Sequence, residues 1–375
     1  MKKYLAGIIT GGLFYLASCG QQGNLTVYKD STVIKFFRRT HGWIASDGAL
    51  TVPLSDGRVL WLMGDSHIND YDSVTGTIPA LFQVRNAALL QPKDDWQWQH
   101  TKTLIGNGPG IKSFFKEIPD DNYFIWPAAG FQQGDTVYVY LANLMKTGKG
   151  AWAWGSAGHD LWGKMKFPEM DKVVGYSPLP DMGGIAFGMG FVKDAKSGYI
   201  YSYGSKLDSV GSAQVFVARF PMDNPNVDWT FWDGENWNSN VNKIIPVGHV
   251  GSGLFVTKVK NKYVLISSEL SVDCDQGKKI YSTTSNNPTG PFSPLKTIYT
   301  IDDTLQGHFP FFYTVILHPE YINDKNELLI TYCINGYNPC VQTFKNGRGN
   351  PDYYRPKGIR VSPEADRPRI IAGFF

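Results

Sequence analysis

The sequence predicts an all-β fold, a five-bladed β-propeller with four-stranded antiparallel blades. Three observations favour it. Glycine and proline are plentiful, aromatic residues make up 14% of the chain, and amphipathic helical patterns are scarce. A unit made of an apolar run, a polar turn and an aromatic-rich run recurs along the chain. The 375 residues are also many for a single β-sandwich, whereas a ring of repeated sheets accommodates them.

The first 18 residues have the features of a secretory signal. Two lysines precede an apolar stretch that is too short to span a bilayer, and the segment ends in Leu-Ala-Ser-Cys at Cys19. This ending resembles the lipobox of bacterial lipoproteins, in which the cysteine is lipidated and becomes the mature N-terminus. We therefore expect a signal peptide at residues 1–18, a lipidated tether at residues 19–24 and one propeller domain at residues 25–375. An ordinary signal peptide with an accidental cysteine is the alternative.

The repeat units each contain two candidate strands joined by a polar turn. They cover residues 47–64, 126–141, 185–203, 249–267 and 309–332. After the first interval they recur at about 60 residues, within the range of elaborated propeller blades. Third strands are expected at residues 84–90, 213–220 and 278–283. Residues 25–37 or residues 357–361 are expected to close the ring by completing a blade.

The polar turns within the units are expected on one rim of the disc. The other rim then collects the starts of the first strands, the ends of the second strands and two long loops, at residues 107–122 and 145–180. The polar and aromatic residues expected on it are Asp47, Asp65, His67, Trp126, Asp181, His249, Glu269 and His308. This second rim is the predicted active face.

The first unit contains the most informative pair of residues. Residues 43–67 read as two alternating runs joined at Asp56-Gly57, a strong hairpin signal. Antiparallel strands place the start of the first beside the end of the second, so Asp47 and Asp65 should emerge on one face. Two neighbouring carboxyl groups supply the acid and the nucleophile or base that glycosidic hydrolysis needs. The alternative is that each only accepts backbone hydrogen bonds at a strand end.

The same hairpin is similar to known proteins. Its motifs Trp-x-x-x-Asp-Gly-Ala, Ser-Asp-Gly-Arg and Leu-Trp-Leu-Met-Gly-Asp-Ser resemble the opening blade of secreted bacterial propeller proteins. Many of these are Bacteroidetes lipoproteins of unknown function, and one branch contains endo-acting arabinofuranan hydrolases. The resemblance implies a five-bladed propeller whose central depression binds glycan, similar to the wider arabinanase, invertase and levansucrase group. That group has acids on its first three blades; here the pattern keeps Asp47, which leaves Asp65, Asp181 and Glu269 as candidate partners.

Other residues on the predicted active face are weaker candidates. Glu269 follows a strand and could face Asp47 as the acid, or pair with a lysine such as Lys278 instead. The histidines, which can bind sugar hydroxyls, are His67, His249 and His308, with His41 nearby. The tryptophans that could stack on sugar rings are Trp43, Trp126, Trp152, Trp154 and Trp162, whereas Trp61 is expected in the core.

Composition and motifs exclude several functions. The net charge is +3, which shows no basic footprint for nucleic acid. Phosphate-loop, dinucleotide and Gly-x-Ser-x-Gly motifs are absent from the sequence. Cys333 and Cys340 are close enough in the sequence to form a disulfide, which would leave Cys274 unpaired, and no spacing predicts a zinc site. We expect no cofactor, with a structural calcium ion in the channel as an open alternative.

Two functions remain. The first is an exported glycoside hydrolase acting on a polysaccharide or oligosaccharide through Asp47, Asp65 and Glu269. The alternative is a non-catalytic glycan-binding lipoprotein. Both imply a monomer that meets a glycan and touches a membrane through its lipid anchor alone, on the periplasmic or cell-surface face of the outer membrane. The sugar, the linkage and the stereochemical outcome are not predicted.

Overall fold

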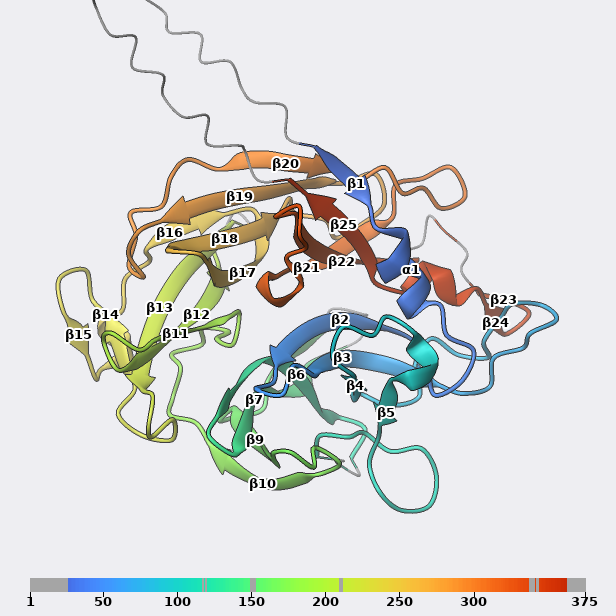
Figure 1. Ribbon diagram of the computed structural model, residues 1–375, viewed down its shortest axis with the longest axis horizontal. Coiled ribbons are helices and arrows are strands. Elements are labelled where there is room, and N and C mark those ends of the chain that lie inside the picture. Colours follow the sequence, from blue (N-terminus) through green and yellow to red (C-terminus); the bar gives the residue numbers. More distant parts are fainter. Residues whose placement is uncertain are drawn as a thin grey trace, which may run out of the picture.

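The computed structural model describes residues 26–116, 118, 120–148, 153–208, 212–336, 341 and 344–362. These residues form one α-helix, α1 (Ser31–Phe37), four short 3-10 turns and otherwise β-strands and loops. Five main antiparallel sheets stand around a central axis (Figure 1). The predicted all-β, five-bladed propeller is therefore confirmed.

Each blade is one sheet, and the sheets follow one another along the chain. Blade 1 contains β2 (Trp43–Pro53), β3 (Val59–Ile68), β4 (Ala87–Gln91) and β5 (Lys102–Leu104). Blade 2 contains β6 (Tyr123–Gln133), β7 (Thr136–Lys146), β9 (Leu161–Lys166) and β10 (Val173–Pro178), and β8 (Trp154–Ser156) also pairs with β7. Blade 3 contains β11 (Phe191–Asp194), β12 (Tyr199–Leu207), β13 (Ala213–Pro221), β14 (Thr230–Trp232) and β15 (Trp237–Asn238), and β16 (Gly248–Val250) also pairs with β13.

The last two blades are four-stranded. Blade 4 contains β17 (Ser252–Val259), β18 (Lys262–Ser268), β19 (Lys279–Ser285) and β20 (Lys296–Thr300). Blade 5 contains β21 (Phe311–His318), β22 (Leu328–Asn335), β25 (Lys357–Val361) and β1 (Val27–Lys29). The remaining elements are β23 (Phe344–Lys345), β24 (Arg348–Gly349), η1 (Trp98–His100), η2 (Val241–Lys243), η3 (Pro319–Tyr321) and η4 (Pro351–Tyr354).

The five predicted units are the inner hairpins of the blades. Their first strands are β2, β6, β11, β17 and β21, and each contacts the next around the ring until β21 contacts β2. The polar turns join these strands to the second strands, and β4, β13 and β19 overlap the predicted third strands. The inner strands therefore surround the axis, which is where a propeller presents its central site.

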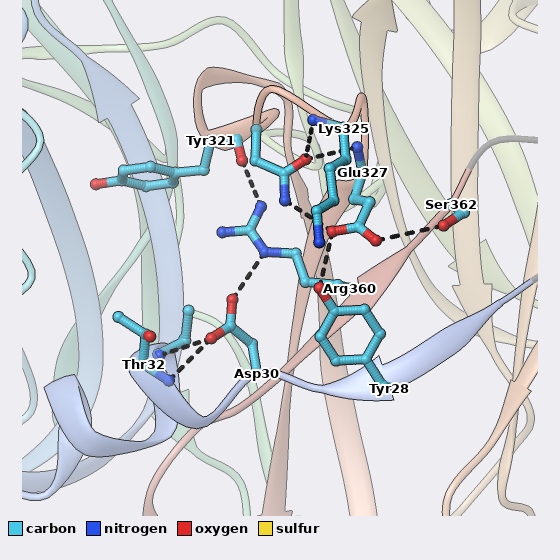
Figure 2. A network of polar contacts seen from close by, with 10 residues as sticks. Tyr28, Asp30, Thr32, Tyr321, Lys325, Glu327, Arg360 and Ser362 are labelled. Atoms are coloured by element: carbon cyan, nitrogen blue, oxygen red, sulfur yellow. Dashed lines mark hydrogen bonds and ion pairs between the residues drawn. The ribbon is translucent and has the colours of Figure 1, made fainter.

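Blade 5 is completed by both ends of the described chain. β1 pairs with β25, Val27 standing opposite Val361 (Figure 1). Figure 2 shows the side chains that hold this strand: Arg360 binds Asp30 at 2.7 Å, and the Tyr28 hydroxyl donates to Glu327 at 2.7 Å. Both candidate closing segments are thus used.

Part of the first closing segment is a helix and not a strand. Asp30 follows β1 and accepts hydrogen bonds from the amides of Thr32 and Val33, at 2.9 and 3.3 Å. This is an N-cap, which favours a helix over the residues that follow it. Helix α1 then buries Val33, Phe36 and Phe37 against blade 1.

Aromatic side chains fill the core between blades. Trp61 is fully buried beside Phe36 and Phe37 of α1, so its predicted core position is confirmed. Trp162 is also fully buried, between blades 2 and 3, and its indole N–H donates to the Pro225 carbonyl at 3.0 Å. The loop position predicted for Trp162 is wrong, because it lies inside strand β9.

The cysteine prediction is also wrong. Cys333 is a free, buried thiol on β22, and Cys274 is disulfide-bonded. The Cys333 thiol faces the neighbouring blade, where it donates to the Gly48 carbonyl at 3.5 Å. Nearness in sequence to Cys340 therefore does not decide its contacts. Cys340, Cys19 and residues 1–24 lie outside the described residues.

No helix in the described part of the chain has the length and apolar character needed to cross a membrane.

Candidate active site

An irregular point of the first hairpin sets the position of Asp47. The register of β2 against β3 shifts there, so that Asp47 faces two residues, Gly64 and Asp65. Such a β-bulge turns a side chain away from the regular alternation. Gly64 leaves the room for it, because a Cβ atom at that position would lie 2.0 Å from the Asp47 carboxylate. The following Gly48 and Ala49 have φ values of +100° and +70°, which complete the distortion.

Three donors from different segments hold the Asp47 carboxylate. The Tyr313 hydroxyl, from the inner strand of blade 5, donates at 3.2 Å. The Tyr354 hydroxyl and the backbone N–H of Asp65 are the other two groups that favour the ionised carboxylate. Asn335 in turn donates to the Tyr313 hydroxyl at 3.2 Å. The side chain is thus fixed from blades 1 and 5 together.

The Asp65 carboxylate has different partners. The indole N–H of Trp126, on the inner strand of blade 2, donates to one oxygen at 2.9 Å. The Arg85 guanidinium donates to the other oxygen at 2.9 Å. Arg85 also lies over the ring of Phe124 at 4.5 Å and over that of Phe82 at 4.8 Å. Asp65 therefore has a cation beside it, whereas Asp47 is held by two phenols and a backbone amide.

These surroundings raise the pKa of both carboxyl groups. Burial, and next the nearby Asp65 charge, raise the pKa of Asp47 to about 7, although its three donors oppose the rise. Burial also raises the pKa of Asp65, to about 6, against the opposing influence of Arg85 and Trp126. Two coupled acids titrate as a pair. Near pH 6 to 7 the two groups therefore hold about one proton between them.

The pair is deep but reachable. Asp65 is 7% exposed, whereas Asp47 and Trp126 are half-buried. Trp154 of β8 packs edge-on against Trp126, with 5.2 Å between ring centres, and is 40% exposed. The blade 2 side of the pair therefore presents aromatic surface to solvent.

The family of the chain is shown by its sequence. Residues 30–363 match the family described as a domain of unknown function, DUF5005. This chain belongs to the DUF5005 family. No curated protein matches it.

Solved structures are similar to this DUF5005 chain to different degrees. A protein of Bacteroides ovatus ATCC 8483, described as "a putative hydrolase", has a TM-score of 0.74, 19% identity and coverage of 92% of both chains. An α-L-arabinofuranosidase from Lactobacillus brevis has a TM-score of 0.48 and 11% identity, covering 89% of this chain and 92% of the other. The GH43_1 enzyme from Xanthomonas citri, complexed with xylose, has a TM-score of 0.47 and 13% identity, with coverage of 89% and 93%.

Asp47, Asp65 and Trp126 are the predicted site residues that the DUF5005 fold brings together. Glu269 does not join them through any contact described here. Its carboxylate accepts hydrogen bonds from the amides of Lys278 and Lys279 at 2.8 and 3.2 Å, which ties the end of β18 to the start of β19. Glu269 thus binds the backbone amide of Lys278 and does not form the ion pair with the Lys278 side chain that the sequence suggested.

The predicted histidines lie in three different settings. His67 is fully buried on β3, and burial lowers its pKa, so that the imidazole is neutral. His308 contacts Asp275 at 2.7 Å in a half-exposed pair beyond blade 4. His249 and His41 are exposed, on β16 and before β2. None of the four is among the hydrogen-bond partners of the two carboxylates just described.

Two further candidates are placed away from the pair. Trp43 is fully buried beside Phe37 and Arg39, and its indole therefore has no surface to offer a ligand. Asp181 is exposed and accepts the Gly183 amide at 2.9 Å within a loop turn. Trp152 lies outside the described residues.

Sequence reasoning missed Arg85, Tyr313 and Tyr354. A charged residue at the start of the apolar run 84–90 was a signal for Arg85, since a buried arginine needs an anionic partner. Tyr313 and Tyr354 had no such signal, because their roles depend on the meeting of blade 5 with blade 1. No cluster of three or more His, Cys, Asp or Glu side chains suited to a metal ion occurs within the described ranges.

Proposed function

We propose that this protein is a glycoside hydrolase in which Asp47 and Asp65 cleave a glycosidic bond of a polysaccharide or oligosaccharide. The observation behind the proposal is the pair itself: the bulge between β2 and β3 brings two carboxyl groups together on the inner hairpin of blade 1, where burial raises the pKa of both. One acid and one carboxylate are what this reaction requires. The B. ovatus protein of the same fold, described as "a putative hydrolase", supports the same reaction class.

The chemistry balances with one water molecule. The protonated carboxyl group gives its proton to the glycosidic oxygen as the bond from that oxygen to the anomeric carbon breaks. The ionised carboxylate either attacks the anomeric carbon, to be displaced later by water, or takes a proton from a water that attacks directly. In both routes water supplies a hydroxyl group to the sugar and a proton that returns to the pair.

Trp126 and Trp154 are the proposed contact surface for the glycan. Sugar rings present C–H faces that pack on aromatic rings. Trp126 lies against Asp65 through its N–H and against Trp154 through its ring, so a sugar on this surface would lie beside the reacting bond. Arabinofuranose-containing glycans are the first class to test, since the first hairpin resembles that of arabinofuranan hydrolases.

The proposal includes export and lipidation at Cys19, as the N-terminal sequence predicts. The mature protein would then be a monomer at the outer membrane, where polysaccharide is met before uptake. Incorporation of radiolabelled palmitate that is lost in Cys19→Ala would support this part, and unlabelled protein that stays inside the cell would contradict it.

A non-catalytic glycan-binding protein is the second candidate. The observation that favours it is the set of three donors on Asp47, which would equally suit a carboxylate with a purely structural task. In that case a sugar would be held by the tryptophans and released unchanged.

Reducing-end release from a panel of plant, microbial and arabinofuranose-containing polysaccharides separates the two. Hydrolysis by the wild type should disappear in Asp47→Asn, an isosteric change that removes the acid. Asp223→Asn, in an exposed turn after β13, is the matched control and should retain full activity. Retention on a polysaccharide affinity gel without any release would instead support the binding protein.

A further inference from the structure

Arg85 is the cation that lies beside one member of the carboxylate pair, Asp65. It lies just before β4 of blade 1, and its side chain contacts Asp65 on β3 and the ring of Phe124 on β6, the inner strand of blade 2. Its guanidinium is 2.9 Å from Asp65, and its side chain is 27% exposed against 10% for that of Asp65. The charge is therefore partly withdrawn from water, where an ion pair is stronger than on the open surface.

Two rings hold the guanidinium in place. The ring centres of Phe124 and Phe82 lie 4.5 and 4.8 Å from the guanidinium carbon. The backbone of Arg85 is also held, because its amide N–H donates to the Ser113 hydroxyl at 3.2 Å. Stacking on aromatic faces suits the planar guanidinium and not the ammonium of lysine. Arg85 is thus a preorganised partner whose position does not depend on a ligand.

The groups that face Asp65 come from four segments. Arg85 supplies a positive charge, Trp126 on β6 supplies an uncharged N–H, and Asp47 on β2 supplies the second carboxyl group. Tyr354 of η4 is close enough to feel the Asp65 charge, and burial raises its phenol pKa far above 10, so it stays neutral. Asp47 itself is faced by two neutral phenols and an amide. The cation therefore acts unequally on the two carboxylates.

We infer that Arg85 is the positioning residue that divides the work of the pair: it keeps Asp65 ionised and oriented, and so leaves the shared proton on Asp47. The inference rests on the proposed hydrolysis. Asp47 then protonates the leaving oxygen, and Asp65 attacks or activates water. Acid and base assignments in such sites follow from neighbours that separate the affinities of two carboxyl groups for a proton.

Removal of the Arg85 charge should reverse the order in which Asp47 and Asp65 lose their protons as the pH rises. In Arg85→Gln, which keeps a hydrogen-bond donor, the Asp65 midpoint should rise by about 1 to 3 pH units, the usual effect of losing a close opposite charge. The Asp47 midpoint should fall, because the proton moves to Asp65. Arg85→Lys should give midpoints between those of the wild type and Arg85→Gln, since it keeps the cation and loses the stacking that positions it. Carbon NMR of protein labelled at the aspartate carboxyl groups measures both midpoints without any substrate. The Asp47→Asn and Asp65→Asn variants identify which signal belongs to which carboxyl group.

Catalysis supplies the second readout. The basic limb of kcat/KM should move upward in Arg85→Gln with the higher midpoint, which then belongs to Asp65. The maximum of kcat/KM should fall about tenfold for each pH unit by which the order of the two midpoints is reversed, because only the minority form with Asp65 ionised and Asp47 protonated can react. A residue that merely supports the fold would lower kcat at every pH and leave the limb in place. Should Arg85→Gln not fold, the Asp47 midpoint is compared between Asp65→Asn and Arg85→Gln/Asp65→Asn. Equal midpoints are expected, because Arg85 acts on the pair through Asp65, and a higher Asp47 midpoint in the double variant would overturn the inference.

The outcomes separate this inference from the proposed function. Unmoved midpoints, or hydrolysis whose basic limb stays in place in Arg85→Gln, would overturn the role of Arg85 and leave hydrolysis intact. Exchanged midpoints in a protein that hydrolyses nothing in the panel would overturn the hydrolase proposal and support the electrostatic role of Arg85.

Discussion

Replacing Asp47 by asparagine should make the protein more stable at neutral and alkaline pH. The folded-state pKa of Asp47, about 7, lies above the ordinary value of 3.8 because burial and the nearby Asp65 charge disfavour the ionised form. The folded protein therefore binds this proton more tightly than the unfolded chain does. Its contribution to the free energy of unfolding is complete below pH 3.8 and is lost as the pH rises through 7. Asparagine keeps the shape and has no charge to lose.

The magnitude follows from the two pKa values. At about 1.4 kcal/mol per pH unit, the difference between 3.8 and about 7 gives a ceiling of about 4 kcal/mol above pH 7. Because Asp47 is half-buried and shares its proton with Asp65, about half of that, roughly 2 kcal/mol, is the expected gain. For a domain of this size it corresponds to an increase in Tm of about 3 °C. Near pH 4 the difference between variant and wild type should vanish.

Differential scanning calorimetry of wild type, Asp47→Asn and Asp223→Asn at pH 4, 6 and 8 checks this. The control carboxylate is exposed and should leave Tm unchanged at every pH. An Asp47→Asn protein that is equally or less stable at pH 8, or whose gain does not grow with pH, would refute the reasoning. It would mean that Asp47 is better solvated or better bound when ionised than its contacts indicate.

Three other changes test separate parts of the structure. Asp30→Ala should lower the free energy of unfolding, measured in urea, by about 3 kcal/mol, because it leaves the largely buried Arg360 without its partner and removes the cap of α1. A decrease under 1 kcal/mol would show that ring closure does not depend on the Asp30–Arg360 pair. Gly64→Ala should fold, but its kcat on the polysaccharide that the wild type degrades should fall at least about 100-fold, because the new Cβ atom displaces the Asp47 carboxylate. An unchanged kcat would show that this carboxylate need not lie against residue 64. Trp154→Ala should raise KM with kcat little changed and Tm nearly constant, whereas the buried Trp162→Ala should lower stability by about 3 to 5 kcal/mol; equal losses of stability would contradict the exposed position of Trp154.

The sequence predicted the blades because each inner hairpin is local. An alternating run, a polar turn and a second run specify β2 and β3 without help from the rest of the chain, and they bring Asp47 and Asp65 together for the same reason. The third strands followed from their β-branched and aromatic residues. The bulge at Asp47 was not predictable, since it depends on the absence of a side chain at Gly64.

Contacts between blades were beyond sequence reasoning. Trp43 and Trp126 both belong to inner strands, yet the first is enclosed by α1 and the second reaches Asp65, and no periodicity separates them. Tyr313 and Tyr354 meet Asp47 across more than 260 positions of the chain. Cys333 misled for the same reason, because its neighbour is Gly48 and not the cysteine nearest in sequence.

The pairing of β1 with β25 in blade 5 has a consequence for synthesis. The Ser362 amide donates to the Thr26 carbonyl at 3.0 Å, and β1 pairs with a strand that is translated more than 320 residues later. Blades 1 to 4 use contiguous segments and can form their sheets as the chain emerges, whereas β1 must wait for residues 357–361. A prematurely terminated product would keep an open sheet edge in its fifth blade, and unpaired edges recruit other chains. Ring closure thereby distinguishes finished from unfinished copies of the protein, and open rings are the copies that quality-control proteases should find.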